Sequence, residues 1–403
     1  MNQPEERVLL CCARTRLDAG ARSQLESLLR HDLDWEYLAG VAASHGVIPL
    51  LYRTLDTGFP HAVPKVWLEQ LRDAYHASGQ RSASMAAELI RILDLFEAHQ
   101  ISAVPFKGPV LAASVYRDLS LRQFGDLDLL VHRKSIPKAG KLLVDHGYQT
   151  GAGLGLHEDP EHVAYLGPRY YVFVHRDHRT RVDLQWRIAE RYFVFSLDSE
   201  PLWNRLVPFS LGGRAVLTFA PADLLLILCV HGSKHRWEAL KWICDVAELV
   251  ERYRSELDWW AIQQEAARFR VERMLGLGLW LAHHLLGAAL PPEVSQRLEA
   301  DSRLRRLARE VEEGLLPRGR ERSRRLERIV FYLKAKDRWQ DRVRFCWRYV
   351  SQFLKCVVVP SSRDRAVLRL PGALSFLYYF IRPFRLTAHY GRSGLARISK
   401  GLS

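Results

Sequence analysis

Two aspartates inside an apolar run are the feature that most constrains this chain. The residues GDLDLLV, from Gly125 to Val131, place Asp126 and Asp128 two positions apart in a segment that is otherwise apolar. Side chains alternate between the two faces of a β-strand, so both carboxylates would leave the same face and repel each other. A divalent cation held between them, most simply Mg²⁺, would offset this repulsion. The alternative is a solvated strand end, where aspartate is common.

The residues around this run have the order strand, helix, strand, helix. Segment 101–105 is typical of a short strand, 109–118 of a helix and 127–131 of a second strand. A further helix is expected over 135–146, because Gly147 is well suited to end a helix. The aspartate pair would therefore lie on the second strand of a small α/β unit.

A predicted hairpin supplies a third carboxylate. Segments 169–175 and 180–186 are rich in β-branched and aromatic residues and flank a polar turn at 177–179. Asp183 lies in the second of these strands, and its apolar neighbours would face the opposite side. Three aspartates on one small sheet permit a two-metal site for phosphoryl transfer.

Apolar residues at helical spacing dominate on both sides of this unit. The pattern runs from Leu17 to about His99, and it starts again at Pro221, which is well placed in the first turn of a helix. The expected parts are an N-terminal helical region (1–99), an α/β catalytic domain (100–219), a helical domain (220–316) and a basic, aromatic C-terminal helical tail (317–403).

The composition predicts a folded protein. The chain has 403 residues, of which 48% are hydrophobic and 26% charged, enough for two or three domains. Its six cysteines lack the spacing of a zinc site and are expected to be reduced thiols. The N-terminus lacks the basic segment of a signal peptide, and no apolar run approaches the roughly 20 residues that span a bilayer. We expect a cytoplasmic protein without a transmembrane segment.

The net charge of +14 favours polyanionic partners such as nucleoside triphosphates, nucleic acid or an acidic membrane surface. The excess is C-terminal: twelve Lys or Arg oppose four Asp or Glu from Arg318 to Arg348, and no acid follows Asp364. The aromatic segment 374–381 with its following arginines is expected to dock on the helical domain. A weak contact with an anionic membrane or another polyanion stays open as the alternative.

Four segments carry a resemblance to a known family. They are Phe106-Lys107-Gly108, the GDLDLLV run, Val182-Asp183-Leu184-Gln185-Trp186, and HGSKHRW from His231 together with Asp245. These segments resemble the signatures of the uncharacterised nucleotidyltransferase-like family within the polymerase-β nucleotidyltransferase superfamily, over about residues 30–260. The resemblance implies an α+β fold, in which a small mixed sheet of the polymerase-β type is flanked by N-terminal helices and a C-terminal helical domain.

The resemblance also implies a chemistry. It makes Asp126, Asp128 and Asp183 catalytic and metal-binding carboxylates for two Mg²⁺ ions. The reaction would move a nucleoside monophosphate from an NTP to a hydroxyl or similar acceptor, an unknown small molecule or peptide, with release of pyrophosphate. Nucleotide or phosphate contacts are expected from Lys107, Gly108, Arg122, His231, Lys234 and His235.

Two departures and several alternatives accompany this interpretation. The superfamily's Gly-Ser turn is Lys107-Gly108-Pro109 here, and the histidine of the close family is Gln185. His231 and His235 lie one helical turn apart and with Asp245 could be mistaken for zinc ligands, but Lys234 beside them opposes a cation. The alternative functions are a phosphotransferase that acts on a peptide or small molecule, and an inactive protein that binds nucleotide or nucleic acid.

Overall fold

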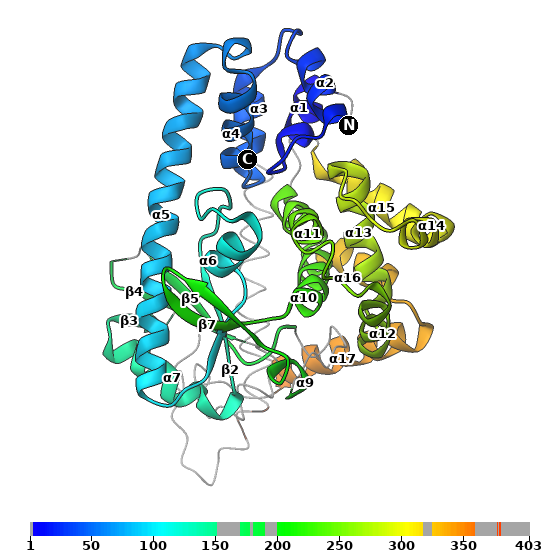
Figure 1. The fold of residues 1–403 in the computed structure, drawn as a ribbon. Helices are drawn as coiled ribbons and strands as arrows, with labels where there is room; N and C mark the ends of the chain where they lie inside the picture. Colours follow the sequence, from blue (N-terminus) through cyan, green and yellow to red (C-terminus); the bar gives the residue numbers. More distant parts are fainter. Residues whose placement is uncertain are drawn as a thin grey trace, which may run out of the picture.

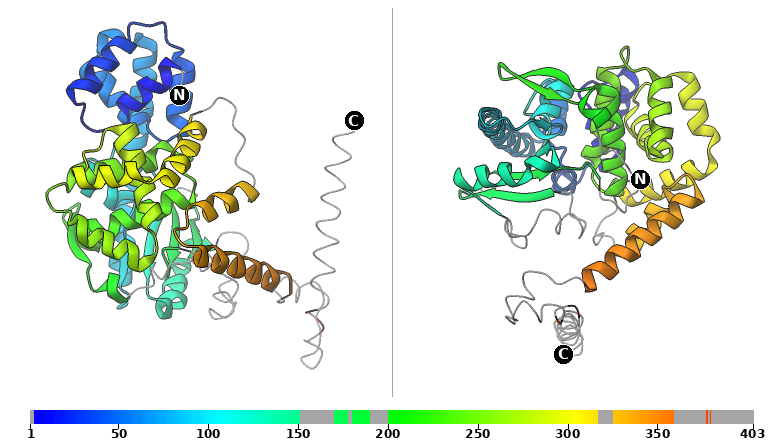
Figure 2. Two further views of the ribbon diagram at one scale, coloured as in Figure 1. Left: turned by 90° about the vertical axis from the view of Figure 1, so that its right-hand side faces the viewer. Right: turned by 90° about the horizontal axis from the view of Figure 1, so that it is seen from below.

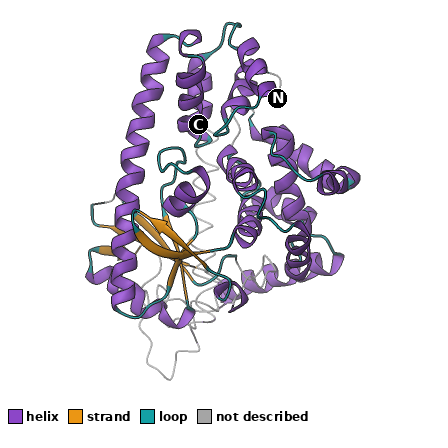
Figure 3. Ribbon diagram, in the orientation of Figure 1, coloured by secondary structure: helices purple, strands orange, loops and turns teal. Residues whose placement is uncertain are grey.

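A small sheet lies between the long helix α5 (Lys65–Ala98) and a group of helices from the second half of the chain (Figures 1 and 3). The computed structural model describes residues 3–150, 170–177, 180–189, 200–316 and 325–358, together with Leu377 and Tyr379. The arrangement is α+β, as the sequence predicts.

The sheet is mixed and has the strand order β1-β2-β5-β4-β3. Only β2 and β5 pair in parallel; β1 with β2, β5 with β4 and β4 with β3 are antiparallel. The predicted hairpin is confirmed as β4 and β5. The bounds are β1 (Ala103–Pro105), β2 (Leu127–Val131), β3 (Tyr148–Thr150), β4 (Tyr170–His175) and β5 (Arg181–Gln185).

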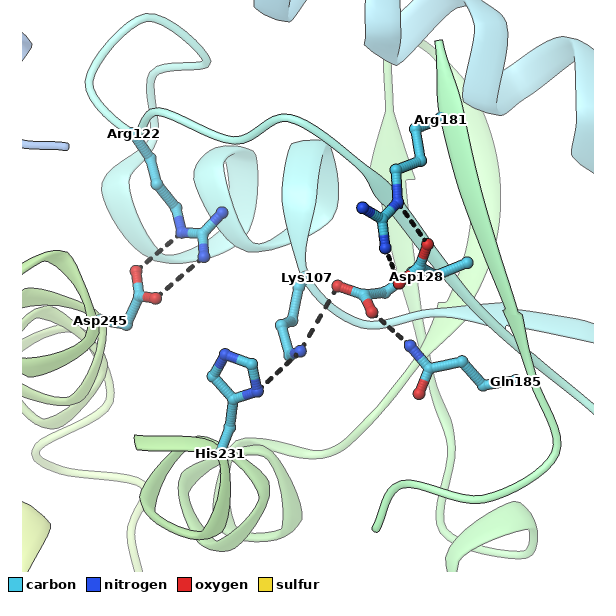
Figure 4. A network of polar contacts seen from close by, with 8 residues as sticks. Lys107, Arg122, Asp128, Arg181, Gln185, His231 and Asp245 are labelled. Carbon is cyan, nitrogen blue, oxygen red and sulfur yellow. Dashed lines mark hydrogen bonds and ion pairs between the residues drawn. The ribbon is translucent and has the colours of Figure 1, made fainter. Parts of the chain in front are cut away.

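The two faces of β2 have different neighbours because its side chains alternate. Leu127, Leu129 and Val131 are buried in a core that includes apolar residues of α5 and of α7 (Ile136–Asp145). Asp128 lies on the opposite face, toward α10 (Pro221–Lys234) (Figure 4). One face of the sheet thus anchors the fold, and the other carries the polar residues.

The N-terminal part is helical, as expected. Proline and glycine divide it: α4 ends at Gly58, and α5 begins directly after Pro64. Asp18 and Asp34 cap α2 and α3, since each carboxylate accepts a hydrogen bond from a backbone N–H of the first turn. The remaining bounds are α1 (Pro4–Cys12), α2 (Ala19–Leu28), α3 (Trp35–Ser44), α4 (Ile48–Gly58) and the short η1 (Pro60–Ala62).

The second half of the chain begins with a strand pair that the sequence analysis does not predict. Its strands β6 and β7 form a separate hairpin, and Thr218 at its end donates a hydrogen bond to the carbonyl of Pro105 in β1 over 2.9 Å. The bounds are α9 (Glu200–Trp203), β6 (Val207–Leu211), β7 (Arg214–Thr218), α10 (Pro221–Lys234), α11 (Leu240–Arg252), α12 (Trp259–Phe269), α13 (Glu272–Leu286), α14 (Pro292–Ala300), α15 (Ser302–Leu315), α16 (Arg325–Lys334) and α17 (Trp339–Val358).

One buried core runs from the N-terminal helices through part of the sheet into α10, α11 and α13. Trp237 lies in it with no exposed surface, and it packs against two glycines. A Cβ on Gly232 would lie 2.4 Å from the Trp237 ring, and a Cβ on Gly278 would lie 2.5 Å from Cys229 Sγ. Because this core crosses the expected boundaries near residues 99 and 219, these parts pack as one body. The domain limits themselves stay a prediction.

The buried cysteines are free thiols, in agreement with the sequence analysis: Cys11, Cys12, Cys229 and Cys244 lie in the core. In the expected C-terminal tail, α16 and α17 are helical, and Figure 2 shows α17 projecting to one side of the body. Within the described part of the chain, no helix is long and apolar enough to cross a membrane. The prediction for segment 374–381 and the arginines after it lies, apart from Leu377 and Tyr379, outside the described residues.

Candidate nucleotidyl-transfer site

The turn after β1 places backbone against the first aspartate. Gly108 has φ +54°, a left-handed conformation that favours glycine, and a Cβ there would lie 3.3 Å from the carbonyl oxygen of Asp126. Pro109 then occupies the first turn of α6 (Gly108–Leu111), where its missing N–H costs nothing. The sequence Lys107-Gly108-Pro109 therefore fixes a close approach between this turn and the acidic segment.

The three aspartates lie together. Asp128 and Asp183 are direct partners in the parallel pairing of β2 with β5, and their exposed fractions are only 8% and 6%. Asp126 precedes β2, and its pKa is raised by burial and then by the charges of Asp128 and Asp183. The predicted grouping of carboxylates on one side of the sheet is present.

Lys107 links the sheet to α10. Its Nζ lies 3.4 Å from Asp128 Oδ2 and 3.2 Å from His231 Nδ1 (Figure 4). The lysine is buried, with 8% of its surface exposed, so its charge acts on Asp128 with little screening by water. The structure thus brings Lys107 and His231, two of the predicted phosphate-binding residues, to the aspartates.

Two further polar residues contact the aspartates: Arg181, which the sequence did not single out, and Gln185, which was noted only where the close family has a histidine. Arg181 Nε and Nη2 donate hydrogen bonds to the two carboxylate oxygens of Asp183, over 2.8 and 3.1 Å. Gln185 Nε2 donates a hydrogen bond to Asp128 Oδ1 (Figure 4). Arg181, Asp183 and Gln185 alternate along β5 and share its face. Extending the two-residue period in both directions from Asp183 would have found them.

Arg122 occupies a different place from the one expected of a phosphate ligand. Its Nε and Nη2 donate to the two carboxylate oxygens of Asp245 in α11, over 2.7 and 2.9 Å, and the pair is buried. The hydroxyl of Tyr116 donates to Asp245 as well, over 2.8 Å. Arg122 therefore joins the segment that precedes β2 to α11, and its phosphate contact stays a prediction.

His231 in α10 and His235, the C-cap residue of this helix, pack against each other with tilted rings. The rings of His231 and His235 lie 4.7 Å apart, and Trp242 lies against both, at 5.6 and 4.9 Å. Asp245, the third residue weighed as a zinc ligand, is held by Arg122. Lys234, on the same turn of α10, accepts a hydrogen bond at its carbonyl from Tyr332.

Lys241 is a further cation that no sequence signal singled out. Burial lowers the pKa of its ammonium, as do the nearby charges of Arg122 and Lys107, whereas Asp245 and then Asp126 raise it. Gly46, with φ +68°, leaves room for its stem, since a Cβ there would lie 2.8 Å from Lys241 Cδ. Lys241 lines a cavity of about 320 Å³ that also includes Gln123, Phe124 and small residues of α3 and α5.

A family model described as an uncharacterised nucleotidyltransferase matches residues 31–287. The chain belongs to this nucleotidyltransferase family. The matched range contains the whole sheet, α10, α11 and every residue of the site described above. No curated protein and no solved structure matches the chain.

The nucleotidyltransferase presents more negative than positive charge at the aspartates. Lys107 and Arg181 contact the carboxylates directly, so two cations face the three charges of Asp126, Asp128 and Asp183. Carboxylate oxygens are the donors that Mg²⁺ prefers, and the donor set fits this ion. Across the described residues, no three His, Cys, Asp or Glu side chains are arranged around a common metal position. Because Lys107 pairs with Asp128 and Arg181 pairs with Asp183, a bound ion would compete with both cations.

Proposed function

We propose that this nucleotidyltransferase moves a nucleoside monophosphate from an NTP to a hydroxyl or similar acceptor and releases pyrophosphate. The observation that carries the proposal is the pairing of Asp128 with Asp183 across β2 and β5, with Asp126 beside them and its pKa raised by their charges. Acidic side chains that repel each other at one buried position are unfavourable for stability, and a function explains why they are kept.

Asp126, Asp128 and Asp183 would hold the metal, two Mg²⁺ ions in our proposal. When bound, the ions supply positive charge to the phosphates and lower the pKa of the acceptor hydroxyl. The protein itself would hold the three carboxylates on one side of the sheet and would exclude water from them by burial. Gly108 contributes by letting the turn after β1 approach the backbone of Asp126.

Cations around the aspartates would orient the triphosphate. Lys107 already stands between Asp128 and His231, and Lys241 adds a second ammonium near Asp126. Fixed positive charges of this kind stabilise the negative charge on transferring phosphates. Lys234, His235 and Arg122 would contribute from α10 and from the segment that precedes β2.

A test is the product released from the NTP. Purified protein would be incubated with each NTP, Mg²⁺ and a panel of hydroxyl acceptors, and pyrophosphate would be measured. We expect acceptor-dependent pyrophosphate from the wild type and none from Asp128→Asn, while Asp73→Asn, an exposed change on α5, behaves as the wild type. Release of nucleoside diphosphate without pyrophosphate would support the phosphotransferase alternative. NTP binding without any product would support the inactive binding protein.

A further inference from the structure

A second cavity, of about 720 Å³, lies apart from the aspartates. Its walls come from the segment before α2, from the π-helix η2 (Ala112–Tyr116) and the residues after it, and from the last turns of α11 and α13. None of Lys107, Asp126, Asp128 or Asp183 lines it. It therefore belongs to a different part of the molecule from the site described above.

Arginine is the prominent residue of this cavity. Five arginines and four carboxylates line it, and each carboxylate already accepts hydrogen bonds or pairs with a cation. Asp18 accepts hydrogen bonds from Arg14 and from the backbone N–H of Ala21. Asp118 accepts one from the N–H of Ser120 and lies 3.6 Å from Arg53. Glu248 accepts from the N–H and the hydroxyl of Thr15, and Glu251 accepts from the N–H of Ala289.

Three of the arginines are not neutralised in this way. Among the described residues, the guanidinium groups of Arg16, Arg117 and Arg252 have neither a hydrogen-bond partner nor a carboxylate within ion-pair distance. Arg252 lies over the ring of Tyr253 at 5.2 Å, and its buried Nε has no acceptor. The buried Nε of Arg14 lacks an acceptor too. The cavity therefore offers more donors than the protein itself uses.

One of these three arginines, Arg117, has an unusual backbone conformation. Arg117 directly follows the π-helix η2 and has φ +59°, in the left-handed region that side chains other than glycine rarely adopt. Single π-turns and left-handed residues of this kind are frequent at functional sites, because the surrounding structure must hold them in place. The conformation places Arg117 at the cavity wall.

We propose that this cavity binds a phosphorylated small molecule. Guanidinium groups present paired N–H donors that match phosphate oxygens, and three such groups here lack a partner. The volume is in the range of cavities that hold small organic ligands. This inference goes beyond the proposed function and does not depend on it.

Tyr116 connects the cavity with the catalytic segment. Its side chain lines the cavity, while its hydroxyl donates to Asp245, the carboxylate that holds Arg122. A ligand in the cavity would thus lie against the same residue that helps to fix Arg122. The cavity therefore adjoins the residues that fix Arg122 but lies apart from the aspartate cluster.

The experiment is a calorimetric titration of the full chain with inorganic phosphate and with glucose 6-phosphate, at constant ionic strength and without NTP. Glucose is the uncharged control ligand. The variants are Arg16→Gln, Arg117→Asn and Arg252→Gln; asparagine is chosen because it tolerates the left-handed conformation. Arg306→Gln, an exposed arginine of α15, is the matched control, and Lys107→Gln tests binding at the aspartates instead. Thermal unfolding verifies that each variant is folded.

We expect both phosphates to bind and glucose not to bind. Each cavity variant should weaken phosphate binding by about tenfold or more, since each removes charge-assisted hydrogen bonds, whereas Arg306→Gln and Lys107→Gln should leave it unchanged. Arg16 is exposed, so its variant keeps the test decisive even if another variant unfolds. Loss of binding in Lys107→Gln alone, equal weakening in Arg306→Gln, or no phosphate binding at millimolar concentration would overturn the proposal.

Discussion

Asp128 and Asp183 stand directly opposite each other in the parallel pairing of β2 with β5. Neighbouring strands lie about 4.8 Å apart, so two buried carboxylates are forced into proximity by the sheet itself. Lys107 and Arg181 oppose their charges, and Asp126 adds a third.

Asp126→Asn should make the protein more stable at neutral pH. The pKa of Asp126 is raised in the folded state, so the carboxyl group favours folding while protonated, and that advantage is lost as the pH rises through the raised pKa. Urea unfolding should show a gain for the variant at pH 7 that shrinks toward pH 4. Asp73→Asn, on the exposed side of α5, should show no such pH-dependent gain. A variant less stable than the wild type at pH 7 would make Asp126 a structural residue.

Arg181→Gln should destabilise the metal-free protein by about 1–2 kcal/mol, because the buried Asp183 loses a charged partner that is itself partly exposed. If Mg²⁺ competes with Arg181 for this carboxylate, the rise in melting temperature on adding Mg²⁺ should be larger in the variant. Arg181→Lys, which keeps the charge, should fall between the two. An unchanged Mg²⁺ shift in Arg181→Gln would argue against metal binding at Asp183.

Arg122→Met should cost about 3–5 kcal/mol of stability, because Asp245 would be left buried and charged without its guanidinium. The double variant Arg122→Met/Asp245→Leu should be more stable than the sum of the single changes predicts. Chemical denaturation of all four proteins measures this coupling. Additive effects would contradict a direct pair between the two side chains.

Gly232→Ala should destabilise the core by about 1–3 kcal/mol, because its Cβ would lie 2.4 Å from the ring of the fully buried Trp237. Gly40→Ala is the matched control. Gly40 also lies inside a helix, nothing lies within 4 Å of a Cβ there, and alanine should stabilise that helix by about 0.5–1 kcal/mol. Opposite shifts in melting temperature are the expected result, and a similar shift in both would contradict the packing described for Trp237.

Local patterns predicted the elements that depend on local chemistry. The strand expected over 127–131 is found as Leu127–Val131, and the helical pattern expected to run to about His99 ends with the helix Lys65–Ala98. The strand begins directly after the acidic residue Asp126, and the helix begins directly after Pro64, so a local residue marks the start of each element. The β6–β7 hairpin was missed although its signal is local: Val207, Phe209 and Leu211 alternate with polar or proline positions, and Gly212-Gly213 suits a two-residue turn.

Contacts between distant segments could not be read from the sequence. Arg122 and Asp245 are 123 positions apart, and only the packing of α11 beside η2 brings them together. The position of Lys241 depends in the same way on Gly46, which lies in the turn between α3 and α4. Alternation along a strand places Asp126 and Asp128 on one side of the sheet, whereas the pairing of β2 with β5 brings Asp183 to them.

The transfer of label from an NTP to an acceptor tests the central claim most directly. Wild-type protein and Asp128→Asn would be incubated with Mg²⁺, candidate acceptors and NTPs that carry ³²P at either the α or the γ position. The proposed reaction breaks the bond between the α and β phosphates, so α-label should appear on the acceptor with the wild type and be absent with Asp128→Asn. Label on the acceptor from the γ position alone, or equal α-label transfer by Asp128→Asn, would contradict nucleotidyl transfer at this site.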